Sequence, residues 1–227
     1  MTVPAGTRVN CRSGCGPGKA IRRVEGLVVL TLLVTAPLAA GPLERLEELG
    51  RALRSRPVWT ASYTQEYIAA GMTQGTFETG RVWVAWPDRA RFETGDPPVR
   101  MMGLAGRQVR LVDLEVPSCD EELLDDEQWA RIPLAAVLDP HEALERFTVL
   151  ESGDDGIALV PREIGGVSRV VVVLGTGSLP ARVTVIDPQG AVNRLDFEAW
   201  TEAAGPPGGG WLPAAPEGVE CIVPGGG

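Results

Sequence analysis

Apolar and polar side chains alternate over short stretches along most of the chain after residue 57. Such a period of two residues predicts β-strands that turn one face toward a core. We expect strands over residues 58–70, 75–86, 89–95, 99–104, 108–116, 146–151, 157–161, 169–174, 181–187, 191–200 and 219–223. Glycine, proline and aspartate fall between several of these stretches, where they favour turns. The spacing indicates one large antiparallel sheet.

Two other stretches have the pattern of helices. Pro42 begins the first, in which leucines at positions 43, 46, 49 and 53 share one face, and Arg56-Pro57 ends it. The second, residues 133–138 (PLAAVL), is short and apolar, and residues 140–145 add a helical turn. A sheet that curves needs a cover over its concave face. We therefore expect a mainly β (α+β) fold: a single curved antiparallel sheet forming an incomplete β-barrel, with an N-terminal helix and a short helical lid.

The N-terminal region has the pattern of a secretory signal peptide. Arg22 and Arg23 precede the apolar run from Gly26 to Ala40, which ends in small residues. A membrane-spanning helix needs about 20 apolar residues, and this run is shorter. We expect residues 1–40 to be the signal peptide, with the first ~20 residues as an over-long start, and 41–224 to be the working domain. The alternative is an uncleaved N-terminal anchor.

The net charge of the chain limits the classes of partner that it is expected to bind. The whole chain has a formal net charge of −9. Five of its 21 basic and one of its 30 acidic residues lie in 1–40, which leaves 16 and 29, or a net charge of −13, after cleavage. Binding of nucleic acid depends on Lys and Arg that contact phosphates, and adhesion to anionic lipid also needs cations. Neither kind of partner is expected.

Two cysteines, Cys119 and Cys221, lie in the predicted working domain. In an oxidising compartment such a pair is expected to form a disulfide. It would close a loop of about 100 residues, which is worth up to roughly 4–5 kcal/mol in the chain-entropy model. The sequence alone leaves open whether the two Cα atoms come close enough.

Residues that perform catalysis or bind metal are sparse. His141 is the one histidine, so a zinc site or a histidine-supported nucleophile lacks its partners. The acidic clusters 120–122 and 125–127 do not have EF-hand spacing and are expected to be solvated. Two carboxylates that meet only in space would still permit glycoside hydrolysis. We expect no catalytic residue, no metal and no cofactor.

Aromatic and methionine side chains stand out in a chain otherwise poor in aromatics. Each one taken alone is most simply a core residue. A concave sheet lined by several of them and capped by a short helix would instead leave a pocket for an apolar ligand. The side chains expected to line this pocket are Trp59, Tyr63, Val84, Trp86, Phe92, Met102, Leu134, Val137 and Leu138.

Several segments, in order, resemble the LolA-like family, the periplasmic carriers of outer-membrane lipoproteins. They follow the leucine helix and comprise residues 61–65 (ASYTQ), 80–87 (GRVWVAWP) with 91–93 (RFE), 101–113, 133–138 and 216–220 (PEGVE). The resemblance implies an incomplete β-barrel whose lid covers an apolar cavity for acyl chains. It implies a monomer without enzymatic activity, located in the periplasm. Its partners would be lipoproteins or lipids, an inner-membrane lipoprotein-releasing transporter and an outer-membrane receptor.

One position departs from the family pattern. Carriers of this family typically have an arginine before the proline of the second motif, and it hydrogen-bonds to the lid. Trp86 stands there in this chain, with Arg89 and Arg91 as neighbouring cations. An indole offers only one N–H donor. Two other functions therefore remain open: a module that senses lipid or assists an exporter without transporting, and a small exported hydrolase.

Overall fold

The computed structural model describes residues 40–125, 128–129, 140–153, 156–163 and 165–223. Nearly all of the predicted signal peptide and all of the predicted lid helix at 133–138 lie outside these ranges. Within them, no helix is long and apolar enough to cross a bilayer.

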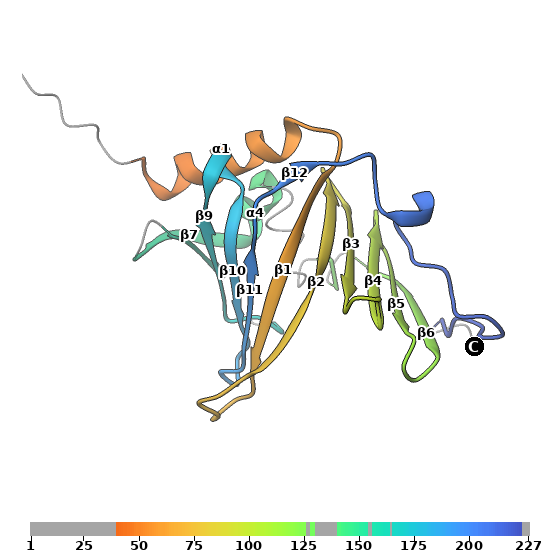
Figure 1. The fold of residues 1–227 in the computed structure, drawn as a ribbon. Coiled ribbons are helices and arrows are strands. Elements are labelled where there is room, and N and C mark those ends of the chain that lie inside the picture. Colours follow the sequence, from red (N-terminus) through yellow and green to blue (C-terminus); the bar gives the residue numbers. More distant parts are fainter. Residues whose placement is uncertain (1–39, 126–127, 130–139, 154–155, 164, 224–227) are drawn as a thin grey trace, which may run out of the picture. The chain divides into compact units, whose positions relative to one another are not determined.

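The described residues form one antiparallel sheet of 12 strands (Figure 1). The strands are β1 (Trp59–Ile68), β2 (Thr76–Ala85), β3 (Arg89–Thr94), β4 (Arg100–Ala105), β5 (Gln108–Asp113), β6 (Ser118–Leu123), β7 (Phe147–Ser152), β8 (Gly156–Pro161), β9 (Arg169–Leu174), β10 (Pro180–Ile186), β11 (Val192–Phe197) and β12 (Thr201–Glu202). Their order is β6-β5-β4-β3-β2-β1-β11-β10-β9-β8-β7, and β12 pairs with β1.

The two edge strands, β6 and β7, do not pair with each other in the described ranges, so the sheet is not closed. Helix α1 (Pro42–Arg54) precedes β1, α4 (Pro140–Arg146) precedes β7, and short 3₁₀ turns lie at η1 (Thr176–Ser178) and η2 (Pro207–Gly209). The predicted fold class, a mainly β incomplete barrel with an N-terminal helix and a short helix, is confirmed.

One strand was not predicted, and one predicted strand is absent. The acidic stretch at 118–123 is strand β6, although its side chains are mostly polar. Backbone pairing with β5 over six residue pairs holds it in the sheet, together with the ion pair between Arg110 and Glu121. Conversely, residues 219–223 form no strand, and only one isolated parallel bridge joins Ile222 to Asp120.

Helix α1 covers one half of the sheet. In Figure 1 it lies across the ends of β9 and β10. Its buried leucines Leu46, Leu49 and Leu53 belong to the same core cluster as side chains of β8 and β9. The indole N–H of Trp59 donates to the carbonyls of Ala52 and Leu53, both at 3.2 Å. This contact satisfies two of the carbonyls that the end of a helix leaves unpaired.

The C-terminal segment (residues 203–223) covers the opposite face of the sheet at β2–β5. Gly103 in β4 gives it room, because a Cβ there would lie 2.3 Å from the carbonyl oxygen of Trp211. The buried guanidinium of Arg91 donates to the carbonyls of Gly210 (2.7 Å) and Pro207 (3.3 Å). We call this covered side the outer face of the sheet and the side facing α1 the inner face.

A disulfide between Cys119 and Cys221 attaches the end of the C-terminal segment to β6. The two Cα atoms are 4.4 Å apart across a separation of 102 residues. Backbone hydrogen bonds accompany it, from Glu121 to Ile222 and from Ile222 to Cys119. The chain end is thereby held against the edge strand by covalent and hydrogen bonds together.

Candidate functional site

Three rows of side chains cross the inner face of strands β2–β6. The register of the strands places each row at one level of the sheet, with neighbouring side chains roughly 5 Å apart. The deep row holds Val84, Ala90, Leu104, Val109 and Glu122; the middle row holds Val82, Phe92, Met102, Leu111 and Asp120; the rim row holds Thr94, Arg100, Asp113 and Ser118.

Along β3, β4 and β5 the side chains become more polar from the deep row to the rim row, whereas the members on β6 (Glu122, Asp120 and Ser118) are polar in all three rows. Val84, Ala90 and Leu104 of the deep row are buried and apolar. Phe92 and Met102 of the middle row are partly exposed, although they are as apolar as the deep row. The rim row is polar throughout. Rows on one face are about 6.6 Å apart along a strand, so apolar gives way to polar over little more than two rows.

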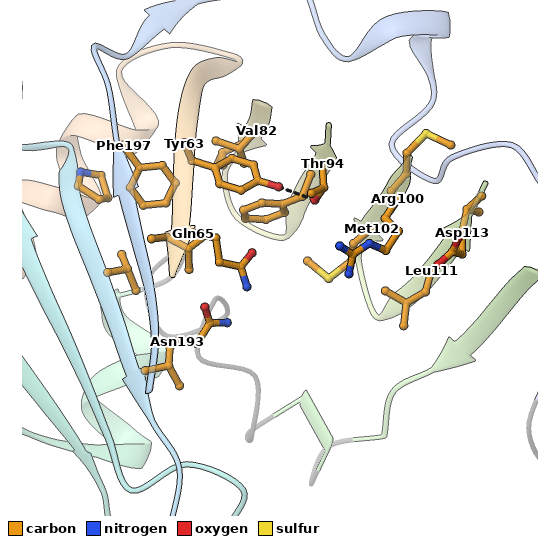
Figure 2. A pocket seen from close by; sticks show the side chains of 18 of the residues that line it. Tyr63, Gln65, Val82, Thr94, Arg100, Met102, Leu111, Asp113, Asn193 and Phe197 are labelled. Carbon is orange, nitrogen blue, oxygen red and sulfur yellow. Dashed lines mark hydrogen bonds between the residues drawn. The ribbon is translucent and has the colours of Figure 1, made fainter. Parts of the chain in front are cut away.

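A cavity of about 640 Å³ lies against the middle and rim rows. Its second wall comes from β1, β10 and β11, and Figure 2 shows Tyr63, Phe197 and Asn193 on that side facing Met102 and Leu111 across the space. The apolar residues of the second wall are Pro180, Val183 and Val185 of β10 and Leu195 and Phe197 of β11, to which α1 adds Leu53 and the segment after β11 adds Trp200. The cavity is therefore a mostly apolar space between two halves of one sheet.

Tyr63 joins the two walls. Its ring lies at 5.7 Å from the ring of Phe92, in an edge-to-face arrangement, and its hydroxyl is 2.8 Å from the Thr94 hydroxyl oxygen. The opposite residue in β2 is Gly80, where a Cβ would come within 2.6 Å of the Tyr63 hydroxyl. Burial raises the pKa of the Tyr63 phenol above its ordinary value. The side chain is therefore a neutral part of the wall at neutral pH.

The rim row contains two of the charged groups that line the cavity, Arg100 and Asp113. Arg100 forms an ion pair with Glu78 and lies in register with Asp113. The hydrogen bond to Glu78, and then the charges of Glu78 and Asp113, raise the pKa of Arg100 further above its ordinary value. Asp113 also accepts the backbone N–H groups of Glu115 (2.8 Å) and Val116 (2.9 Å), so its carboxylate is fixed at the turn after β5.

Two amides add polarity to the other wall. Gln65 and Asn193 point into the space from β1 and β11 (Figure 2). The Oδ1 atom of Asn193 is buried and has no hydrogen-bond partner among the described residues. A buried acceptor without a donor is costly, so a donor from water or a ligand would stabilise it.

Four of the residues predicted to line the pocket do line this cavity: Tyr63, Val84, Phe92 and Met102. Trp59 and Trp86 do not. Trp59 faces the end of α1, to which its indole N–H donates. Leu134, Val137 and Leu138 lie outside the described residues.

Trp86 follows the last residue of β2 and contacts the end of α1 instead of lining the cavity. Its ring is 41% exposed and lies under the guanidinium of Arg54, at 5.5 Å from the ring centre. Arg89 and Arg91 do not supply the missing cation on the inner face. Both belong to the outer face of β3, where Arg91 pairs with Glu93 at 2.7 Å and holds the C-terminal segment.

Sequence reasoning missed the polar part of the cavity, namely Gln65, Thr94, Arg100, Asp113, Ser118, Asp120 and Asn193. The predicted hairpin of residues 99–104 and 108–116 contains a pattern from which one of these polar residues could have been predicted. Once Met102 is taken as facing inward, Arg100 must face inward too, because side chains alternate along a strand. In the described part of the chain, no three His, Cys, Asp or Glu residues are grouped so as to hold a metal ion.

Comparison with known proteins agrees with this architecture. The family model described as outer membrane lipoprotein carrier protein LolA matches residues 56–208, which span the sheet from before β1 to the η2 turn. The chain belongs to the LolA family. The match covers both walls of the cavity, so the site of this LolA-family chain lies within the region that defines the family. No curated protein sequence matches the chain.

Solved structures resemble this LolA-family chain at low sequence identity. A LolA superfamily protein from Nitrosomonas europaea has 12% identity and a TM-score of 0.42, covering 74% of this chain and 96% of its own. An uncharacterized conserved protein from Thermus thermophilus has 13% identity and a TM-score of 0.46, covering 79% and 97%. The lipoprotein LppX from Mycobacterium tuberculosis has 10% identity and a TM-score of 0.36, covering 72% and 97%.

Proposed function

We propose that this protein binds the acyl chains of a lipoprotein or lipid in the cavity on the inner face of its sheet. The observation that supports this most is the order of the three rows. Along β3, β4 and β5, apolar side chains lie deep, partly exposed apolar side chains follow, and polar groups stand at the rim. An amphiphile has the same order along its length. Its tail would contact Phe92 and Met102, and its polar end would lie beside Arg100 and Asp113.

The energetics favour such a ligand. Each methylene group removed from water contributes about 0.8 kcal/mol. Pockets of about 300–1,000 Å³ with mostly apolar walls are typical of sites for small molecules, and this cavity has about 640 Å³. Met102 adds adaptability, since a methionine side chain fits irregular and varied shapes. A carrier must also release its cargo, which agrees with a middle row that is only partly buried.

The proposal also includes transport of the bound lipoprotein between the two membranes. The predicted signal peptide would export the chain, and membership of the family described as an outer membrane lipoprotein carrier favours a shuttle. In this proposal the protein takes lipoproteins from an inner-membrane releasing transporter and delivers them to an outer-membrane receptor, without chemical change to the cargo. This step is tested by adding the purified protein to vesicles that contain lipoproteins. Recovery of the lipoproteins in a membrane-free complex with the protein would support it.

The binding step is tested by placing a charge in the middle row. Met102→Glu should weaken binding of the neutral fluorescent probe N-phenyl-1-naphthylamine by about 100-fold, because a buried carboxylate must lose its hydration. The matched control is Leu123→Glu, which places the same charge on a side chain of β6 that is 74% exposed. The control should bind like the unaltered protein. Equal binding by Met102→Glu and the unaltered protein would show that the cavity is not the site.

A further inference from the structure

The charged groups on the cavity wall are unevenly balanced. Three charged side chains line the cavity in the described part of the chain: Arg100, Asp113 and Asp120. All three come from the wall formed by β4, β5 and β6. The guanidinium of Arg100 is already engaged by Glu78 and lies in register with Asp113. With Arg100 paired to Glu78, the remaining charged side chains on this wall are the carboxylates of Asp113 and Asp120.

Asp113 lies at the level of the sheet where the polar end of an amphiphile would lie, and Asp120 lies on the neighbouring edge strand β6. Asp113 belongs to the rim row, between Arg100 and Ser118. Asp120 closes the middle row directly beside Leu111. Figure 2 shows Arg100 and Asp113 at the same side of the cavity as Leu111 and Met102. A tail lying against Met102 and Leu111 therefore brings its head group to these carboxylates.

We infer that the cavity selects amphiphiles whose head group is a cationic amine over those whose head group is an anionic carboxylate. This inference rests on the proposed binding of acyl chains. Two carboxylates on one wall attract an ammonium group and repel a carboxylate, and the attraction is strongest where the apolar wall lowers the local dielectric constant. Arg100 does not reverse the preference, because its charge is already balanced by its ion pair with Glu78. The net charge of −9 on the whole chain acts in the same direction over longer distances.

Two probes with the same tail test the inference. Dodecylamine and dodecanoate have equal chain length and opposite charge at pH 7, and each is added to displace N-phenyl-1-naphthylamine from the cavity. We expect dodecylamine to displace half of the probe at a concentration about tenfold lower than dodecanoate at low salt. In 0.5 M NaCl the difference should shrink, since salt screens exposed charges.

Matched variants assign the preference to the two carboxylates. Asp113→Asn combined with Asp120→Asn should reduce the preference to less than about threefold. Asparagine at 113 keeps an oxygen that accepts the two backbone N–H groups of the turn, so the fold is retained. The control, Glu217→Gln with Glu220→Gln, removes two exposed charges from the C-terminal segment and should leave the tenfold preference unchanged.

The outcomes separate this inference from the proposed function. Uptake of the neutral probe together with equal or tighter binding of dodecanoate would overturn the charge preference and leave acyl binding intact. Failure of the unaltered protein to take up the neutral probe would overturn the proposed function itself. A preference that survives in the asparagine double variant would overturn the assignment to Asp113 and Asp120.

Discussion

The inner face of the sheet is packed in one half and open in the other. At β8 and β9 it is fully buried under α1: Ile157, Leu159 and Val170 have no accessible surface. At β3–β5 the same face presents partly exposed Phe92 and Met102 to the cavity. Both halves use apolar residues at alternate positions. Among the described residues, what differs is the partner: a leucine-rich helix packs on one half, and the other half borders the cavity.

The open half is supported from its other side. The C-terminal segment covers the outer face of β2–β5, where Arg91 donates to its carbonyls and a disulfide attaches its end to β6. The outer face of this half is thus covered by the C-terminal segment, while its inner face borders the cavity. In both halves the apolar pattern identifies the residues that face inward. Whether these residues form a packed core or the wall of a cavity depends on the element that lies against them.

The largest expected effect comes from removing the disulfide that holds the open half. Replacing both cysteines, Cys119→Ser and Cys221→Ser, should lower the free energy of unfolding by about 4 kcal/mol, because the unfolded chain loses a loop constraint of about 100 residues. Urea unfolding measures the loss. The reduced unaltered protein should match the double variant. Equal stability of the oxidised protein and the double variant would show that the C-terminal attachment does not support the open half.

The next effect concerns the packed half. Leu49→Ala removes a fully buried side chain of α1 from the core cluster, and we expect a loss of about 3 kcal/mol in the free energy of unfolding. Binding of N-phenyl-1-naphthylamine per folded molecule should stay the same. A variant that unfolds normally but binds less probe would mean that α1 shapes the cavity rather than the core.

A matching substitution in the open half should change binding of the probe more than it changes the free energy of unfolding. Met102→Ala shortens a side chain that is already partly exposed, so the loss of stability should be below about 1.5 kcal/mol. Binding of the probe should weaken measurably, because the wall loses apolar contact area. Urea unfolding and probe titration on the same sample check both. A loss as large as that of Leu49→Ala would show that Met102 belongs to a packed core.

The smallest effect is a dependence on pH at β6. Hydrogen bonds from Arg110 and then Gln108 hold the pKa of the Glu121 carboxyl below its usual range. The folded state therefore favours the ionised form, and this stabilisation is complete above the unfolded pKa of about 4.3 and is lost as pH falls through the folded pKa. Glu121→Gln should cost about 1 kcal/mol at pH 7.

The measurement is urea unfolding of both proteins between pH 7 and pH 3. The difference in unfolding free energy between the unaltered protein and Glu121→Gln should disappear at the acid end. A difference that stays constant with pH would indicate that the ionised carboxylate of Glu121 is not what stabilises β6.

Much of the sheet was predictable because short apolar and β-branched stretches are bounded by turn residues. The predicted strands that contain Val82 and Val84 and the valines of β9 match the structure, although the continuous valine run of β9 does not by itself show which side chains face inward. Strand β6 was not predictable from hydrophobicity, since ion pairing of Glu121 and backbone pairing with β5 hold it in place. These are contacts with residues elsewhere in the chain, which a local pattern does not contain.

The candidate site was predictable only in its apolar part. Tyr63, Phe92 and Met102 were identified because aromatic and methionine side chains are scarce and noticeable. The polar rim needed the register of β4 against β5, since only that register brings Arg100 beside Asp113. Trp86 was misplaced because the sequence pattern does not show that the end of α1, with Arg54, contacts this side chain.

The central claim, that the open half of the sheet is a binding wall for acyl chains, is tested most directly by native mass spectrometry of the protein purified without detergent. We predict that the unaltered protein has additional mass from acyl-bearing molecules, released by organic solvent and identified as lipid or lipoprotein. Met102→Glu should lack that additional mass, and Leu123→Glu should retain it. An unaltered protein that has only its own mass, from a cell in which it was exported, would contradict the account.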